Sequence, residues 1–265
     1  METNSINAGD LTISYAEIGK GPPLVLLHGG LTTAAMSWSG RYDQLGEHFH
    51  VFAPDTRGHG RTNNPTGQLR YEQLAEDVVA FCSALDIEHP LIVGYSDGGQ
   101  TAIELALRHP GFARAMVMGG TISQHTQAYE DAVTGWGFPA PGVADFDAIK
   151  RVWGSFFDTI QVVHKGNGEP EYWRTLLEQI ATLWLTVPTY SLEQLQSISA
   201  PTLIAVGDRD HLAGLDQAQR LYEAIPHSEL AIIPNADHGA AESDLFWANV
   251  MDFLKRHAEG KDTPS

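Results

Sequence analysis

Short apolar runs alternate along this chain with amphipathic stretches. The apolar runs contain three or four residues each and lie at 24–27, 51–53, 91–93, 115–118, 203–206 and 230–233. Runs of this kind, bounded by polar or turn residues, are typical of strands buried on both faces. Between them, apolar residues recur at helical spacing, as in Tyr71, Leu74 and Val78. The pattern predicts an α/β fold: a mostly parallel, doubly wound sheet covered by helices on both faces.

Two stretches depart from this rhythm. Residues 11–15 alternate between apolar and polar and predict an antiparallel edge hairpin strand. Residues 121–199 contain no buried-strand run, and this length is far beyond an ordinary connection. Helical spacing recurs inside this stretch at Phe146, Ile149, Val152/Trp153 and Phe156, and again at Trp173, Leu176, Ile180 and Leu183/Trp184. We expect a core built from residues 1–120 and 200–265, with a helical cap inserted at 121–199.

The net charge and the cysteine content indicate which classes of partner and which cellular compartment suit the protein. The 265 residues include 16 Lys and Arg against 33 Asp and Glu, a formal net charge of −17. This balance argues against a general nucleic-acid partner, which needs a basic surface. The single cysteine, Cys82, excludes an intrachain disulfide framework and suits a reducing compartment. The first residues carry no signal-peptide pattern, and no apolar run approaches a membrane span. We therefore expect a cytoplasmic protein without membrane association, and its oligomeric state cannot be read from these features.

The sharpest local motif surrounds Ser96. The residues Gly94-Tyr95-Ser96-Asp97-Gly98 follow the predicted strand at 91–93 and precede a predicted buried helix. This is the strand–turn–helix context of a G-x-S-x-G nucleophile elbow. Glycine at the first and last positions relieves the clash that a tight turn would otherwise create. The serine hydroxyl would project above the carboxyl end of the sheet, where open α/β sheets bind ligands.

A serine hydroxyl needs a general base, and the best-placed histidine is His238. It follows the last predicted strand through Pro234-Asn235-Ala236-Asp237, so it lies in a loop at the same sheet edge. The other candidates lack that position or lie in a turn or in the cap, which favours structural or solvated roles for them: His59, His109, His125, His164 and His211.

An acid must orient the base and stabilise its protonated form. The strand at 203–206 ends in Gly207-Asp208-Arg209-Asp210-His211. Asp210 is preferred because it lies further into the loop, from where it can reach His238. Asp208 is the alternative, better suited to capping the turn or pairing with Arg209. Asp237 is a weak rival, since neighbouring side chains usually diverge.

Two backbone amides are needed to stabilise an oxyanion. One should be that of Asp97, directly after the nucleophile and at a helix N-terminus. The other should come from the loop His28-Gly29-Gly30-Leu31, where we choose Gly30, with Leu31 as the alternative. The Asp97 side chain has two open roles: a first-turn carboxylate that stabilises the helix, or a partner for a cationic substrate group such as an α-amine.

These motifs together resemble the α/β-hydrolase family with an inserted cap. The matching pieces are spread in the expected order: His28-Gly29-Gly30, Asp55-Thr56-Arg57-Gly58-His59-Gly60-Arg61, the Ser96 elbow, residues 201–210 and the loop around His238. The order Ser96, Asp210, His238 is the order of the triad in this family. The resemblance implies a structural role for the turn that begins at Asp55. The serine nucleophile excludes the family's haloalkane dehalogenases and epoxide hydrolases, which use aspartate there.

The resemblance implies a serine hydrolase that cleaves a small carboxylic ester or lactone through an acyl-enzyme on Ser96. Alternatives within the family are C–C bond hydrolysis of ring-cleavage products, cofactor-free perhydrolysis (haloperoxidase activity) and amino-acid-ester hydrolysis. An alternative of another class is a non-catalytic small-molecule receptor. No motif predicts a cofactor or a metal site. Aromatic residues of the cap suggest a substrate with an apolar portion, in a pocket formed by Leu31, Trp136, Trp153 and Trp184.

Overall fold

The chain is described by a computed structural model, which covers residues 3–165 and 168–258. These residues form an eight-stranded sheet in the order β1-β2-β4-β3-β5-β6-β7-β8. The strands are β1 (Asn4–Ala8), β2 (Leu11–Ile18), β3 (Pro23–Leu27), β4 (His50–Pro54), β5 (Leu91–Tyr95), β6 (Ala115–Gly119), β7 (Thr202–Gly207) and β8 (Ser228–Ile233). Strands β4, β3, β5, β6, β7 and β8 are parallel neighbours, whereas β2 pairs antiparallel with both β1 and β4. The predicted fold class is confirmed.

Two expectations about the sheet edges need correction. The strand at 11–15 does form a hairpin, but its partner β1 is the outermost strand and β2 lies second. The short alternating pattern of β1 carries few apolar residues, so it gave no strand signal of its own. At the other edge, β8 is not buried on both faces: Ile232 is half exposed on this outermost strand of the described sheet.

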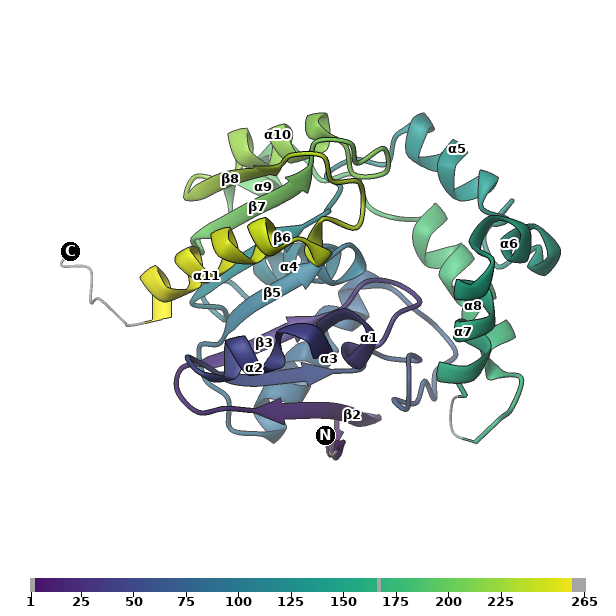
Figure 1. Cartoon of the computed structure of the whole chain (residues 1–265), viewed down its shortest axis with the longest axis horizontal. Coiled ribbons are helices and arrows are strands. Elements are labelled where there is room, and N and C mark those ends of the chain that lie inside the picture. Colours follow the sequence, from purple (N-terminus) through teal and green to yellow (C-terminus); the bar gives the residue numbers. More distant parts are fainter. Residues whose placement is uncertain (1–2, 166–167, 259–265) are drawn as a thin grey trace.

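Helices cover both faces of the sheet (Figure 1). One face packs against α3 (Tyr71–Ala84), α4 (Asp97–Arg108), α9 (Leu192–Gln196) and α10 (Leu215–Ala224). The other packs against α1 (Ala34–Trp38), α2 (Tyr42–Gly46) and α11 (Asp244–Ala258), with short 3-10 turns at Ser39–Arg41 and Ala240–Glu242. Burial of these apolar faces against the sheet is the main force that holds the layers together. Within the described residues, no helix has the length and apolar composition needed to cross a bilayer.

Four helices between β6 and β7 lie beside the carboxyl ends of the parallel strands (Figure 1). We call them the cap helices: α5 (Gln127–Gly135), α6 (Phe146–Trp153), α7 (Ser155–Val163) and α8 (Tyr172–Leu185). The helical spacing through Phe156 is interrupted, since Gly154 adopts a positive φ of 53° and separates α6 from α7. The cap helices share an apolar cluster with core residues such as Leu69 and Leu74. Helix α9, by contrast, places Leu195 in the cluster on the sheet face.

Candidate active site

Ser96 lies in a sharp turn between β5 and α4. Its backbone has φ 54° and ψ −116°, a strained conformation for a residue with a side chain. The turn is closed so tightly that a Cβ at Gly94 would lie 2.2 Å from the carbonyl oxygen of Gly98. A Cβ at Gly98 would lie 2.0 Å from the carbonyl oxygen of Leu27. Both glycines are therefore required by the geometry, and they present the Ser96 hydroxyl at the edge of the sheet.

His238 and Asp210 meet Ser96 at this edge. The Nε2 atom of His238 lies 3.0 Å from the Oγ atom of Ser96, and its Nδ1 atom lies 2.8 Å from Oδ2 of Asp210. With an ionised Asp210, the imidazole donates from Nδ1 and accepts the serine proton at Nε2. Tyr95 helps to hold the loop, since its hydroxyl donates to the carbonyl oxygen of His238 over 2.9 Å. The imidazole of His238 is thus within hydrogen-bond distance of both other side chains that the sequence singled out, Ser96 and Asp210.

The surroundings of Asp210 keep it ionised. Its Oδ1 atom accepts hydrogen bonds from the amides of Leu212 and Ala213, at 2.9 and 2.8 Å. Burial acts to raise the pKa of Asp210, but the hydrogen bond and charge of His238, with these two amides, outweigh it and lower the pKa. Asp208 instead faces solvent, where its Oδ1 accepts from the amide of Ala236 at 3.3 Å.

The two residues proposed to supply oxyanion amides line the same space as Ser96. Gly30 and Asp97 line a cavity together with Ser96. Within the described residues, neither of their amides donates to a protein acceptor. The amide of Leu31, the alternative, is already committed: it donates to Nε2 of His59 at 3.2 Å. The free donors are therefore at Gly30 and Asp97.

Three buried histidines hold the loop that carries Gly30. Besides the His59 contact, the carbonyl oxygen of Leu31 accepts from Nε2 of His164 at 3.0 Å. His164 ends the cap helix α7, and its Nδ1 accepts from the amide of Gly60 at 2.9 Å. The Nε2 atom of His28 accepts from the backbone amide of Thr56, in the turn after β4, at 2.9 Å. Each ring thus acts as a neutral donor and acceptor with a defined tautomer.

Burial keeps these imidazoles uncharged. It lowers the pKa of His164 to about 4 and also lowers the pKa of His28. The pKa of His59 lies well below its ordinary value because of burial and because His28 and His164 are close. The expectation that His59 and His164 have structural roles agrees with this arrangement.

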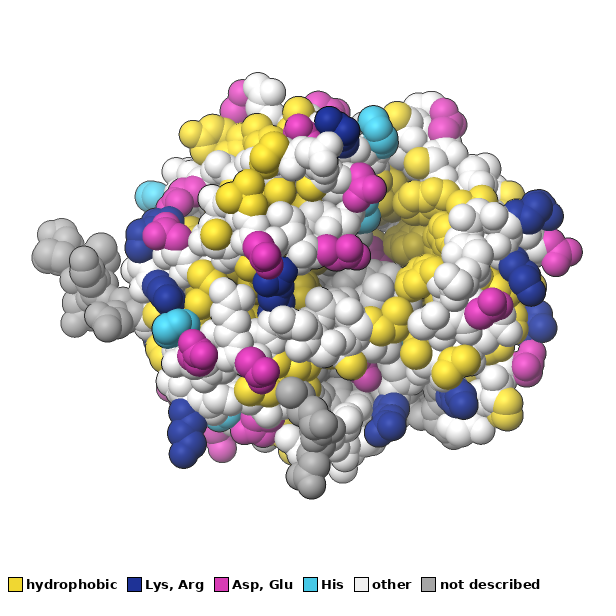
Figure 2. Space-filling model, in the orientation of Figure 1, with side chains coloured by type: hydrophobic (Ala, Val, Ile, Leu, Met, Phe, Trp, Pro, Cys, Tyr) yellow, Lys and Arg dark blue, Asp and Glu magenta, His cyan; other side chains and the backbone are white. Residues whose placement is uncertain are grey.

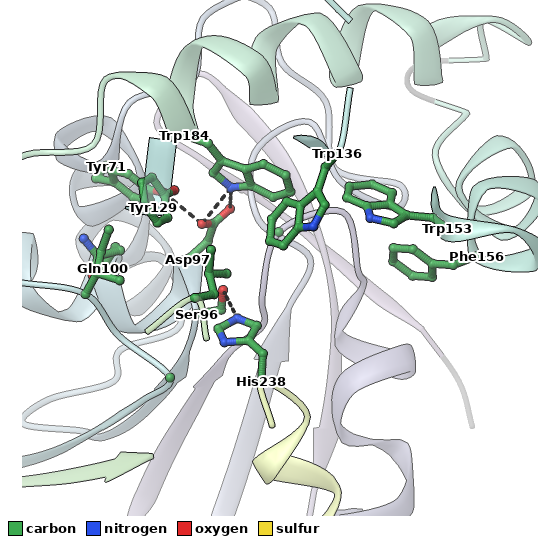
Figure 3. Close-up of a pocket in the computed structure, with 14 residues that line it drawn as sticks. Tyr71, Ser96, Asp97, Gln100, Tyr129, Trp136, Trp153, Phe156, Trp184 and His238 are labelled. Carbon is green, nitrogen blue, oxygen red and sulfur yellow. Dashed lines mark hydrogen bonds between the residues drawn. The ribbon is translucent and has the colours of Figure 1, made fainter. Parts of the chain in front are cut away.

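The Asp97 carboxylate is fully enclosed between core and cap. Its Oδ1 accepts from the Tyr71 hydroxyl at 2.8 Å, and the Nε1 atom of Trp184 lies 3.0 and 2.9 Å from its two oxygens (Figure 3). Burial raises the pKa of Asp97, although the bonds from Trp184 and Tyr71 act to lower it. Among the described residues, the donors to this carboxylate are the Tyr71 hydroxyl and the Trp184 indole, and no backbone amide of α4 is among them. It links the cap helix α8 to α3 and α4, while an edge of the carboxylate still lines the cavity.

A cavity of about 170 Å³ lies over Ser96 and beneath the cap helices. Trp136, Trp153 and Trp184 line it, as expected, and their rings also pack edge to face on one another with centroids 5.8–6.2 Å apart. The expectation for Leu31 is not met: its side chain is fully buried in the core–cap cluster and does not line this cavity. Figure 2 shows a hollow with hydrophobic side chains between the core and the cap helices.

A second, larger space adjoins Ser96 on the side of the 3-10 turn after His238. It has a volume of about 750 Å³ and is more open to solvent. Met36, Trp38 and Arg41 contribute to its wall, and Gly30, Ser96 and His238 line both spaces. The Ser96 hydroxyl therefore lies at the junction of an enclosed aromatic cavity and an open groove.

Sequence reasoning missed several residues of the enclosed cavity. Tyr71, Gln100, Tyr129 and Phe156 all line it (Figure 3). Gln100 carried a usable signal, since it is a polar residue one helical turn after Ser96 in a helix expected to be buried. The others belong to helices whose apolar spacing explains them equally well as packing residues.

Comparison with known proteins identifies the family. Residues 24–248 match the model of the "Alpha/beta hydrolase family". Among curated proteins, the pimeloyl-[acyl-carrier protein] methyl ester esterase of Nitrosospira multiformis is 29% identical, over 93% of this chain and 100% of the relative. The 2-hydroxy-6-oxo-6-(2'-aminophenyl)hexa-2,4-dienoic acid hydrolase of Metapseudomonas resinovorans is 26% identical, over 96% and 91%.

Solved structures agree on the fold. The meta-cleavage product hydrolase of Pseudomonas fluorescens IP01 superposes with a TM-score of 0.77 and 24% identity, over 96% of this chain and 97% of that one. The family model spans most of the sheet, from β3 to the start of α11. The resemblance noted from the sequence motifs is thereby confirmed, and the chain belongs to the α/β-hydrolase family and is a hydrolase.

Proposed function

We propose that the protein hydrolyses a small carboxylic ester or lactone through an acyl-enzyme on Ser96. The observation that carries this proposal is the continuous chain of contacts from Ser96 Oγ to His238 and on to Asp210, at 3.0 and 2.8 Å. Such a chain activates a hydroxyl that would otherwise be a weak nucleophile. We also propose the division into a core of residues 1–120 and 200–265 and a cap of residues 121–199, since the cap helices enclose one side of the site.

The proposed reaction has two halves. His238 takes the Ser96 proton at Nε2 while the serine oxygen forms a bond to the carbonyl carbon of the substrate. The amides of Gly30 and Asp97 stabilise the oxyanion. The carbon–oxygen bond to the leaving group then breaks, and His238 gives the proton to the departing alcohol. In the second half, His238 removes a proton from water, the resulting hydroxide attacks the acyl carbon, and Ser96 leaves with the proton.

The two spaces that meet at Ser96 suggest how the substrate lies. The enclosed aromatic cavity suits the acyl part, whose apolar surface it would remove from water. The open groove, which includes His238 and Gly239, suits the leaving alcohol, because the leaving oxygen must be near Nε2.

A C–C hydrolysis like that named for the Metapseudomonas relative is less well supported. That relative acts on a dienoic acid, and an acid substrate carries a carboxylate at neutral pH. The enclosed cavity includes the Asp97 carboxylate, and no Lys or Arg is among the described residues that line it. A substrate carboxylate buried there would lose its hydration without a cation to pair with, which would weaken its binding.

A labelling experiment with turnover tests the proposal. The wild-type protein should react with a fluorophosphonate probe and should hydrolyse a panel of p-nitrophenyl esters and lactones. Ser96→Ala should lose both properties while its melting temperature changes little. A non-catalytic receptor would not label, and retained turnover in Ser96→Ala would show that another residue is the nucleophile.

A further inference from the structure

Gln100 is a buried side chain whose polar atoms have no partner in the described part of the protein. It is 3% exposed, and both its Oε1 and Nε2 atoms lack a hydrogen bond. The equally buried Gln217 shows the contrasting, structural use of glutamine: its Oε1 accepts from the amide and hydroxyl of Ser123 and from the amide of Gln124. An unpaired buried amide is costly, so its partner should come from outside the chain.

The residue that carries the unpaired amide belongs to the wall of the enclosed cavity. Gln100 lines this cavity together with Ser96, Asp97 and Tyr129. In Figure 3 it lies on the side of Ser96 near Tyr71 and Tyr129, away from the cluster of Trp136 and Trp153. The cavity thus combines an aromatic side with a side that can form hydrogen bonds.

The distance between Ser96 and Gln100 determines which atom of a bound acyl chain would meet the glutamine side chain. The backbone N–H of Gln100 donates to the backbone carbonyl oxygen of Ser96 at 2.9 Å, so the two residues are one helical turn apart. Four residues rise about 6 Å along a helix. An extended acyl chain advances about 1.2 Å per bond, so about five bonds, counted from the Oγ atom of Ser96, cover a similar distance. The group that meets Gln100 would therefore lie near the fifth carbon of the acyl chain.

The charge of the neighbouring residue restricts that group. Asp97 and Gln100 are three residues apart on α4 and therefore lie on the same side of the helix. A carboxylate at the end of the acyl chain would be buried beside the acidic side chain of Asp97, and no described lining residue is a Lys or Arg that could pair with it. A neutral group that both donates and accepts would match the two free atoms of the glutamine amide.

We propose that Gln100 forms a binding subsite for a terminal carboxamide on the acyl part of the substrate, which it holds by two reciprocal hydrogen bonds. This inference rests on the proposed function, in which the acyl part occupies the enclosed cavity. It assigns to the enzyme a preference for acyl chains of about five carbons that end in a neutral polar group.

Three methyl esters of nearly equal shape test the preference. They are methyl 5-amino-5-oxopentanoate, methyl 5-methylhexanoate and monomethyl glutarate, which end in a carboxamide, an isopropyl group and a carboxylate. Hydrolysis of each is followed by proton release in a pH-stat. We expect kcat/KM for the carboxamide to exceed that for the isopropyl ester by at least about tenfold. The carboxylate ester should be the poorest of the three.

The variant Gln100→Met keeps the length of the side chain and removes its hydrogen-bonding atoms. In this variant, kcat/KM should fall for the carboxamide ester and rise for the isopropyl ester, so that the preference reverses. Thr101→Ser is the matched control, since Thr101 is buried on the same helix but does not line the cavity, and serine keeps the hydroxyl that donates to the carbonyl oxygen of Asp97. It should retain the wild-type ratio.

The outcomes separate the two proposals. If the wild-type protein hydrolyses the carboxamide and isopropyl esters within twofold of each other, or prefers the carboxylate, the subsite is refuted while the esterase function stands. The same holds if Gln100→Met keeps the wild-type ratio. If none of the esters is hydrolysed, the proposed function fails. Calorimetric titration of the esters into Ser96→Ala then still tests the subsite. A lower Kd for the carboxamide ester than for the isopropyl ester supports the subsite, and equal Kd values overturn it.

Discussion

His164 donates from Nε2 to the carbonyl oxygen of Leu31 over 3.0 Å, and this contact joins the cap to the loop beside Ser96. The amide of the same Leu31 donates to His59. Both backbone groups of Leu31 are thus held by imidazoles, which fixes a residue whose φ of 57° is unfavourable for a branched side chain. Because Gly30 directly precedes Leu31, the position of one proposed oxyanion amide depends on a histidine of the cap.

Loss of the His164 contact should impair catalysis more than binding. We expect His164→Ala to lower kcat about tenfold or more, since a misplaced donor stabilises the oxyanion less. KM should change by less than about twofold, because His164 lines neither space at Ser96. Steady-state kinetics with a p-nitrophenyl ester, at a temperature well below the melting transition of the variant, measure this division.

The two amide variants at position 164 identify which contact matters. Glutamine can place its side-chain N–H near the position of Nε2, so His164→Gln should recover much of the lost kcat. Asparagine can place a side-chain oxygen that accepts from the amide of Gly60, but it has no donor that reaches the carbonyl oxygen of Leu31. The kcat of His164→Asn should therefore remain low. Equal kcat in the alanine variant and the wild-type protein would contradict this positioning role.

Acid should destabilise the fold through the same buried histidines. In the unfolded chain the imidazole of residue 164 has its ordinary pKa of 6.5, whereas burial lowers the folded-state pKa to about 4. The unfolded state therefore binds the proton first as the pH falls. This contribution to stability is complete above pH 6.5 and is lost progressively as the pH falls toward about 4. His28 and His59, whose pKa values are also lowered, act in the same direction.

Urea unfolding at pH 7.5 and pH 5.0 measures this loss. A single histidine with these pKa values accounts for about 2 kcal/mol of the difference in unfolding free energy between the two pH values. His164→Gln removes that titrating group, so its stability should fall by correspondingly less over the same interval. An identical fall in both proteins would show that residue 164 is not neutral in the folded state.

The two aspartates after β7 should differ sharply when each is replaced by asparagine. Asp210→Asn leaves the shape of the loop but removes the carboxylate that orients His238, so kcat should fall by roughly 10³- to 10⁴-fold. Asp208→Asn should change kcat by less than about twofold, since within the described residues its side chain accepts from the amide of Ala236 and forms no hydrogen bond with Ser96, His238 or Asp210. The kinetics of both variants decide the assignment: a large loss in Asp208→Asn with none in Asp210→Asn would reverse it.

The core of the site could be predicted from the sequence because each of its parts follows a recognisable strand. Ser96, Asp210 and His238 lie in the turns or loops that follow β5, β7 and β8, and the carboxyl ends of parallel strands lie at one edge of a sheet. Glycines flanking Ser96 then specify the turn itself. This logic needs only local pattern and topology, and no knowledge of how distant helices pack.

The cavity wall could not be predicted in this way. Gln100, Tyr71 and Tyr129 come from α4, α3 and α5, and which of their faces meet depends on how the cap helices pack on the core. The same limit applies to Leu31, whose neighbours in sequence suggested a pocket position but whose side chain packs into the core–cap cluster. The break at Gly154 was hidden because the apolar spacing continues across it.

The buried carboxyl group of Asp97 gives the enclosed cavity a negative charge whenever it is ionised. Its partners Tyr71 and Trp184 are neutral donors, and they leave part of its hydrogen-bonding capacity free. A Cβ on Gly30 would lie 2.4 Å from Oδ2 of Asp97, so the carboxylate is close to a proposed oxyanion amide. A negative charge there opposes oxyanion formation unless a nearby cation offsets it.

An amino-acid ester should therefore be a better substrate than its N-acetylated form. The α-ammonium group of a bound ester lies next to the reacting carbonyl, where it can pair with Asp97, and we expect a preference in kcat/KM of about tenfold. Comparison of an alanine p-nitrophenyl ester with its N-acetyl derivative measures it at a pH where the amine is charged. Asp97→Asn keeps the shape, removes the charge and should abolish the preference. Equal turnover of the two esters by the wild-type protein would leave Asp97 with a purely structural role, as the link between the cap and the core.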